Sequence, residues 1–140
     1  MLSAKSRPTK LHALIQFLVI SALGRQGVEA LGELTVRLSE KKYLIPDVAA
    51  AAYIQEPYPT EPVLLCCEIL SPEDRLGSML AKCEEYHAWG VPSCWVIDPV
   101  KQAAWEYHAG GEPVRISAGS PLQAGSLLVS LNELFSGAQS

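Results

Sequence analysis

The chain has 140 residues, the size of one ordinary globular domain, and we expect a single domain over residues 1–140. Apolar residues make up 49% of the chain and charged residues 19%, a composition that excludes a disordered, collagen-like or coiled-coil protein. The formal net charge of -4 argues against a generally basic nucleic-acid-binding protein, although it allows a local basic patch.

The first predicted element is a helix over residues 10–24, whose spacing of apolar residues suits packing on a sheet. Its apolar stretch over residues 11–20 is preceded by three basic residues, as in a secretory signal peptide: Lys5, Arg7 and Lys10. His12 and Gln16 interrupt the stretch, and we expect them on one helical face, opposite the apolar residues. We favour the amphipathic helix, with the signal peptide as the alternative. The stretch is too short to span a membrane.

Two strands are predicted next, over residues 31–38 and 43–53. Polar and apolar side chains alternate in the first, which is typical of a half-buried strand, and Glu33 lies near its start. The polar residues 39–42 form a turn, so we expect a hairpin. Three prolines then indicate a loop over residues 54–62.

Residues 63–70 form an apolar run with a single charge, Glu68, which is typical of a strand covered on both faces. A carboxylate inside such a strand costs several kcal/mol unless a cation pairs with it. The partner is either the cation of a structural ion pair or a metal ion, and Glu68 alone does not distinguish them.

A second helix is predicted from Ser71, as the N-cap residue, and Pro72 to Gly90. If this helix folds back over the preceding strand, about 15 Å of helix brings Lys82 over Glu68. The two charged groups are then able to meet. The alternative is an exposed lysine that pairs with Glu73 or Glu85.

The remaining predicted elements are strands over residues 93–98 and 103–108, an edge strand over 113–117, and a short helix from Ser130 through Phe135. This order predicts an α/β fold with a mixed sheet and flanking helices. The four cysteines lack metal-ligand spacing and are interpreted as core residues, with a disulfide or a redox role as the alternatives. The three tryptophans are likewise interpreted as core residues.

Asp47 follows Pro46 and is expected within the second strand, where aspartate is unusual. Taken alone, the residue is better interpreted as an aspartate at a bulge caused by the proline or at a strand end. Two carboxylates on adjacent strands, Asp47 and Glu68, suit a hard cation such as Mg²⁺ or Mn²⁺. With the Lys82 ammonium nearby, such a site is suited to phosphodiester hydrolysis.

These residues resemble the Uma family of putative restriction endonucleases, formerly a domain of unknown function, within the PD-(D/E)xK nuclease superfamily. The resemblance covers roughly residues 10–135 and rests on four segments: residues 45–49, residues 65–72, Lys82 with Tyr86, and residues 90–99. It implies a restriction-endonuclease-like fold, with a central mixed sheet flanked by helices. It also implies that Asp47 and Glu68 bind the metal, together with the backbone carbonyl of Ile69.

The chain departs from the family pattern in two ways. The lysine that commonly follows the second acid by two residues is replaced by Leu70, and Lys82 from the next helix fits its role. Family members also carry a further segment with a glutamate before the first helix, so we expect a shortened N-terminus, with Glu33 as a candidate additional acid. His12 matches a histidine of the family but is left out of the catalytic set.

The resemblance predicts a Mg²⁺- or Mn²⁺-dependent endonuclease that hydrolyses phosphodiester bonds of DNA. The alternative is a catalytically degenerate nuclease-fold module that acts in binding or assembly. We expect a cytoplasmic protein that does not enter a membrane. A homodimer is a candidate assembly, since two chains cut both strands of a duplex more easily than one.

Overall fold

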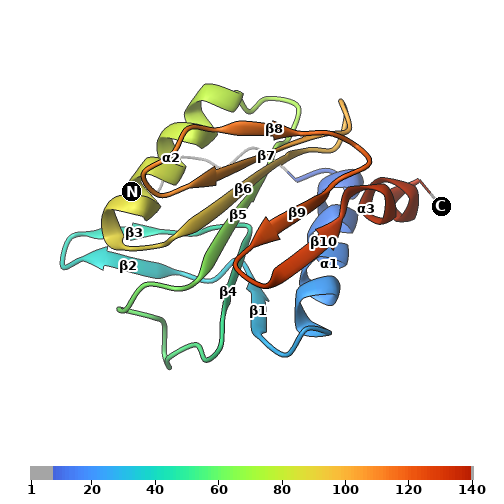
Figure 1. Cartoon of the computed structure of the whole chain (residues 1–140). Coiled ribbons are helices and arrows are strands. Elements are labelled where there is room, and N and C mark those ends of the chain that lie inside the picture. The colour runs from blue at the N-terminus through green and yellow to red at the C-terminus, as the bar shows by residue number, and fades with distance from the viewer. Residues whose placement is uncertain (1–7, 140) are drawn as a thin grey trace.

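The computed structural model describes residues 8–139, which form a mixed α/β fold with helices on both faces of a central sheet (Figure 1). The basic residues Lys5 and Arg7 lie outside this range. The described helices are α1 (Lys10–Gly24), α2 (Leu76–Trp89) and α3 (Leu131–Ala138). The described strands are β1 (Glu29–Gly32), β2 (Val36–Ser39), β3 (Lys42–Leu44), β4 (Val48–Ala51), β5 (Leu65–Ile69), β6 (Ser93–Asp98), β7 (Ala103–His108), β8 (Val114–Ile116), β9 (Pro121–Ala124) and β10 (Leu127–Ser130).

The central sheet has six strands in the order β1-β4-β5-β6-β7-β8. Strands β5 and β6 are parallel, whereas the other neighbouring pairs are antiparallel. Two parallel neighbours need a crossover connection, and α2 provides it. The predicted mixed sheet is therefore present, with the parallel pair β5–β6 at its centre.

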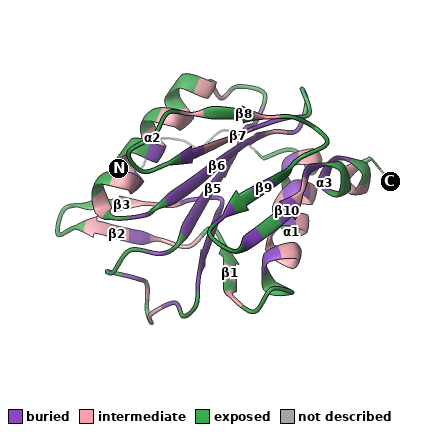
Figure 2. Cartoon of the chain, viewed as in Figure 1, coloured by how far each residue is buried: buried purple, intermediate pink, exposed green. Residues whose placement is uncertain are grey.

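Each face of the sheet carries its own apolar cluster. Figure 2 shows that the central strands β5 and β6 are largely buried. On one face, α1, α3 and the hairpin β9–β10 cover side chains such as Cys67 and Trp95. On the other face, α2 and the hairpin β2–β3 cover side chains such as Cys66 and Cys94. All four cysteines are buried and free, which confirms their interpretation as core residues.

The two strands predicted over residues 31–38 and 43–53 are each divided, so these predictions are wrong in extent. The first is interrupted after Gly32, because Glu33 adopts a left-handed backbone conformation with φ of 54°. The second is interrupted before Asp47, next to a proline that cannot donate a ladder hydrogen bond. The two pieces next to the turn form the predicted hairpin as β2–β3, and the two pieces farther from the turn pair as β1–β4.

Helix α2 begins four residues later than its sequence predicts. The Ser71 N–H donates to Asp74 Oδ2 (2.8 Å) and the Asp74 N–H donates to the Ser71 carbonyl (2.9 Å), which closes a separate turn. Arg75, with an extended backbone, is the N-cap residue instead of Ser71. The predicted end at Gly90 is confirmed, where φ is +122°.

The hairpin β9–β10 is absent from the sequence prediction. Its signal is an alternation of apolar residues on both sides of Gly125 and Ser126, a two-residue turn of a type that favours hairpins. The predicted closing helix is confirmed, since the Ser130 hydroxyl accepts the Glu133 N–H at 3.2 Å.

Helix α1 has the predicted bounds and packs on the sheet through Ile15, Val19 and Leu23, all fully buried. The prediction for its polar residues is wrong: His12 belongs to the buried stripe, and the Gln16 amide is directed toward the sheet rather than away from it. Among the described helices, none is long and apolar enough to cross a membrane.

Candidate active site

The candidate site forms where β4 and β5 separate. Val48 pairs with Cys67, so Asp47, one residue before β4, lies opposite Glu68 in the same register. The Asp47 side chain takes the place of a strand partner, because its Oδ2 accepts the Ile69 N–H at 2.7 Å. Asp47 is thus at a strand end, as the sequence favours for this residue taken alone, and not within the predicted strand over residues 43–53.

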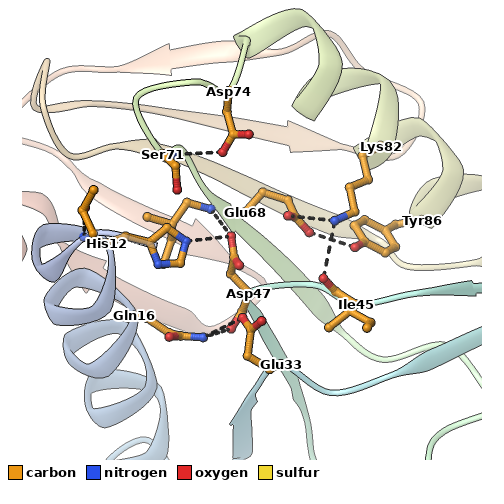
Figure 3. Close-up of polar contacts among 12 residues, drawn as sticks. His12, Gln16, Glu33, Ile45, Asp47, Glu68, Ser71, Asp74, Lys82 and Tyr86 are labelled. Atoms are coloured by element: carbon orange, nitrogen blue, oxygen red, sulfur yellow. Dashed lines mark hydrogen bonds and ion pairs between the residues drawn. The ribbon is translucent and has the colours of Figure 1, made fainter. Parts of the chain in front are cut away.

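Glu68 is buried on the α2 side of this gap, with an exposed fraction of 2%. Its two carboxylate oxygens accept hydrogen bonds from one helix: Lys82 Nζ donates to Oε1 at 3.1 Å, and Tyr86 OH donates to Oε2 at 2.8 Å (Figure 3). The two donors are four residues apart on α2, and therefore on one helical face. The predicted meeting of Lys82 and Glu68 is present.

Lys82 also donates to the carbonyl of Ile45 at 3.4 Å, which connects α2 to the segment before Asp47. The alternative prediction, an exposed Lys82 that pairs with Glu73 or Glu85, is wrong. Lys82 pairs with Glu68, and Glu85 pairs with Lys42 from the hairpin β2–β3. The Lys82 side chain is 21% exposed, so its ammonium lies at the boundary between the buried carboxylates and solvent.

Burial shifts the titration of Glu68. Loss of water raises the pKa of its carboxyl group to about 7; the Lys82 ammonium and the Tyr86 hydrogen bond oppose this rise, and the Asp47 charge adds to it. The same burial raises the pKa of the Tyr86 hydroxyl, so Tyr86 acts as a hydrogen-bond donor throughout the physiological pH range.

Two residues of α1 complete the surroundings of Asp47, and the sequence interpretation missed both. His12 Nε2 lies 3.4 Å from Asp47 Oδ2. Gln16 Nε2 donates to the Asp47 carbonyl at 2.7 Å and to Glu33 Oε2 at 3.0 Å. The signal that was available is their spacing of four residues, which we assigned to the wrong side of the helix.

Glu33 lies directly after β1, not near the start of a strand as predicted. Its N–H donates to the Asp47 carbonyl at 3.4 Å, and its side chain is exposed beside Gln16 (Figure 3). A Cβ added at the neighbouring Gly32 would come within 2.9 Å of Gln16 Nε2, so a glycine there leaves room for the bridging amide. The structure thus brings Glu33 next to Asp47, with its carboxylate on the solvent side.

The oxygen atoms at this gap fit a hard divalent cation. Carboxylate oxygens accept more than one partner, so the bonds to Glu68 leave acceptor capacity. The Ile69 N–H points toward Asp47, and in a strand the carbonyl of the same residue points to the same side. No group of three His, Cys, Asp or Glu side chains within residues 8–139 is arranged to hold a metal ion. A cation here would depend on two carboxylates, a carbonyl and water, a mixture that suits Mg²⁺.

Comparison with known proteins identifies the family and the fold of the chain. The model of the Uma2 family, described as "Putative restriction endonuclease", matches residues 2–138. The chain belongs to this family. The crystal structure of a putative nuclease belonging to DUF820 from Anabaena variabilis ATCC 29413 has a similar fold, with a TM-score of 0.81 and 20% identity. The match covers 96% of this chain and 85% of that chain. No curated protein matches the sequence.

The Uma2 match confirms the resemblance stated from the sequence, and the structural likeness confirms the fold class. At 20% identity, the likeness to the Anabaena protein concerns the fold alone. The roles of Asp47, Glu68, Lys82, Ile69 and Glu33 remain predictions, although the structure places the first four around one gap and Glu33 beside it.

Proposed function

We propose that this Uma2 protein is a metal-dependent endonuclease that hydrolyses phosphodiester bonds of DNA, with Mg²⁺ or Mn²⁺ as its cofactor. The observation that carries the proposal is the arrangement of Lys82, Glu68 and Asp47 around the gap between β4 and β5. Two buried carboxylates with one ammonium beside them form a site that a divalent cation would complete.

Each residue has a distinct task in this proposal. Asp47, Glu68 and the Ile69 carbonyl would hold the cation, which supplies positive charge for the phosphate and makes a water molecule more acidic. Tyr86 orients the Glu68 carboxylate through its hydrogen bond. Lys82, at the solvent boundary, would stabilise negative charge that develops on the phosphate in the transition state.

A catalytically degenerate binding module is the second candidate, and one observation favours it. Both oxygens of Glu68 already accept hydrogen bonds, so Glu68 is satisfied as a structural ion pair without any cation. In that case Asp47 has only a structural role: it accepts the Ile69 N–H where β4 and β5 separate. The cytoplasmic location and the homodimer remain predictions from the sequence.

Cleavage of supercoiled plasmid in Mg²⁺ or Mn²⁺ tests the proposal. Asp47→Asn keeps the size of the side chain but removes its charge, and we expect it to abolish metal-dependent cleavage. Lys82→Ala should lower the cleavage rate by roughly 100-fold, a typical loss for a group that stabilises transition-state charge. An RNA of the same sequence, assayed in parallel, separates DNA from RNA as the substrate.

Glu29→Gln is the matched control for Asp47→Asn. Glu29 also accepts a backbone N–H at a strand boundary, from Ile54 at 2.6 Å, but at the far end of the β1–β4 pair. This variant should cleave normally. Wild-type protein that shows no cleavage, or cleavage that survives Asp47→Asn, would contradict the nuclease proposal and leave the binding module.

A further inference from the structure

A groove of about 570 Å³ lies beside the candidate active site, at the carboxyl ends of the parallel strands β5 and β6. The loops that follow these two strands form its walls, and Trp105 and Arg115 from β7 and β8 also line it. Crevices at the carboxyl ends of parallel strands are common ligand sites. Leu70 and Ser71, which line this groove, follow the candidate metal ligand Ile69 directly in the chain, and Figure 3 shows Ser71 and Asp74 just beyond Glu68.

Three cations line the groove: Arg75, Lys101 and Arg115. All three are exposed, and none forms an ion pair or a side-chain hydrogen bond with another residue in the range 8–139. A chain with a net charge of -4 thus gathers three of its 11 lysines and arginines around one hollow. We call these three residues and the hollow they line the cationic groove.

Two acids also line the cationic groove, but both are engaged by backbone donors. Asp98 Oδ1 accepts the N–H groups of Val100 and Lys101 at 3.1 and 3.0 Å, and Asp74 Oδ2 accepts the Ser71 N–H. These bonds shape the two loops. With three cations and two acids, the groove keeps an excess of positive charge. Among the cations, the Arg115 guanidinium lies over the Trp105 ring, 5.9 Å from its centroid, which orients it in advance.

We propose that the cationic groove binds the sugar–phosphate backbone of a nucleic acid strand beside the bond to be cut. A row of cations that lack acidic partners is suited to a polyanion, and a volume of this size accommodates a nucleotide unit. This inference rests on the proposed nuclease function for its ligand, but binding in the groove requires no metal. The two proposals can therefore fail separately.

The test measures binding of fluorescently labelled single-stranded DNA, duplex DNA and RNA by anisotropy, in EDTA, over a range of salt concentrations. The double variant Lys101→Ala/Arg115→Gln should weaken nucleic acid binding by about tenfold or more at low salt. If both cations contact phosphates, the slope of log K against log salt should fall by about 1.4 to 1.8. Comparison of the three ligands identifies the nucleic acid preferred.

The control is Arg25→Ala/Lys41→Ala, which removes two exposed charges outside the cationic groove. Equal weakening in both double variants would mean a general charge effect and would overturn the proposal, as would wild-type protein that binds no nucleic acid. Heparin binding that depends on the groove, without nucleic acid binding, would also overturn it.

Asp47→Asn separates the two proposals. It should bind nucleic acid as the wild type does, because Asp47 lies outside the cationic groove. Retained binding without any cleavage by the wild type contradicts the nuclease proposal alone. Normal cleavage and normal binding in the groove variant contradict the groove alone.

Discussion

Glu68 combines three properties that are seldom found in one side chain. It is almost fully buried, it accepts two hydrogen bonds from α2, and its pKa is raised to about 7. An ordinary glutamate has a pKa near 4.3, so the folded protein holds a proton on Glu68 more tightly than the unfolded chain does. Glu68 therefore links folding to pH.

The sign of this linkage gives a prediction. Between the unfolded and folded pKa values the folded state binds more protons, so stability should fall as pH rises from about 4.5 to about 7, then level off. The contribution of Glu68 is at most about 3 kcal/mol. Glu68→Gln should remove this dependence, measured as urea unfolding midpoints between pH 5 and 8. A variant that keeps the wild-type pH profile would contradict the assignment to Glu68.

The matched control is Glu84→Gln. Glu84 also accepts a hydrogen bond from a tyrosine hydroxyl, that of Tyr107 at 2.9 Å, but Glu84 is exposed. Its replacement should leave the decrease in stability between pH 5 and 7 unchanged. Metal titration of the Glu68 variant then distinguishes a metal ligand from a structural ion pair. If Glu68 forms only an ion pair, Glu68→Gln should not change cation binding.

At the scale of elements, the positions of the central strands and of the end of α2 were predictable from the local sequence. Gly90 shows why: α2 must stop where the chain turns back to β6, and φ of +122° is open to glycine. A Cβ at this position would also lie 2.7 Å from Pro62 Cγ. Both the backbone and the neighbouring loop thus require a glycine.

Gly90→Ala should destabilise the protein by about 1 to 3 kcal/mol, because it adds backbone strain and a close contact. Gly77→Ala, within the same helix, is the control: a Cβ there meets nothing within 4 Å. It should stabilise by up to about 1 kcal/mol, as alanine favours a helix over glycine. Thermal unfolding of the two variants checks both signs; a neutral Gly90→Ala would contradict the argument.

The elements that sequence reasoning missed were decided by contacts between distant residues or by overlooked turns. The start of α2 depends on the competition between an N-cap at Ser71 and a turn closed by Asp74, and both fit the same residues. His12 and Gln16 were assigned to solvent because polarity alone does not reveal a buried partner. That partner, Asp47, follows 31 residues after Gln16.

The candidate site was predictable in part because its acids lie in otherwise apolar segments of the sequence. Glu68 is a lone charge in an apolar strand, and helical geometry was enough to bring Lys82 to it. Tyr86 entered only through the family resemblance, and its bond to Glu68 was visible only in the structure. The division of the first early strand was missed because alternation continues across its break, and that of the second because Pro46 and Asp47 were included in one strand.

At the scale of the whole molecule, the sheet is shared by two apolar clusters that have separate coverings. Strands β4, β5 and β6 contribute alternate residues to both clusters, so neither cluster is able to persist without them. We therefore expect one cooperative unfolding transition, as is usual for a domain of this size.

Leu23→Ala, on the α1 side, and Val96→Ala, on the α2 side, test this expectation. Both side chains are fully buried, and we expect losses of about 2 to 5 kcal/mol for the leucine and a smaller loss for the valine. In each variant the transitions followed by tryptophan fluorescence and by far-ultraviolet circular dichroism should coincide. Two separated transitions would mean that the clusters unfold independently.

Where β4 and β5 separate, one backbone amide of β5 bonds to a side chain instead of a strand. The Ile69 amide proton is held by the carboxylate of Asp47 and not by a neighbouring strand. Its exchange with solvent deuterium and its chemical shift therefore depend on a candidate catalytic group. A single backbone resonance in an NMR spectrum can thus report the state of Asp47 in the intact protein, with no substrate present.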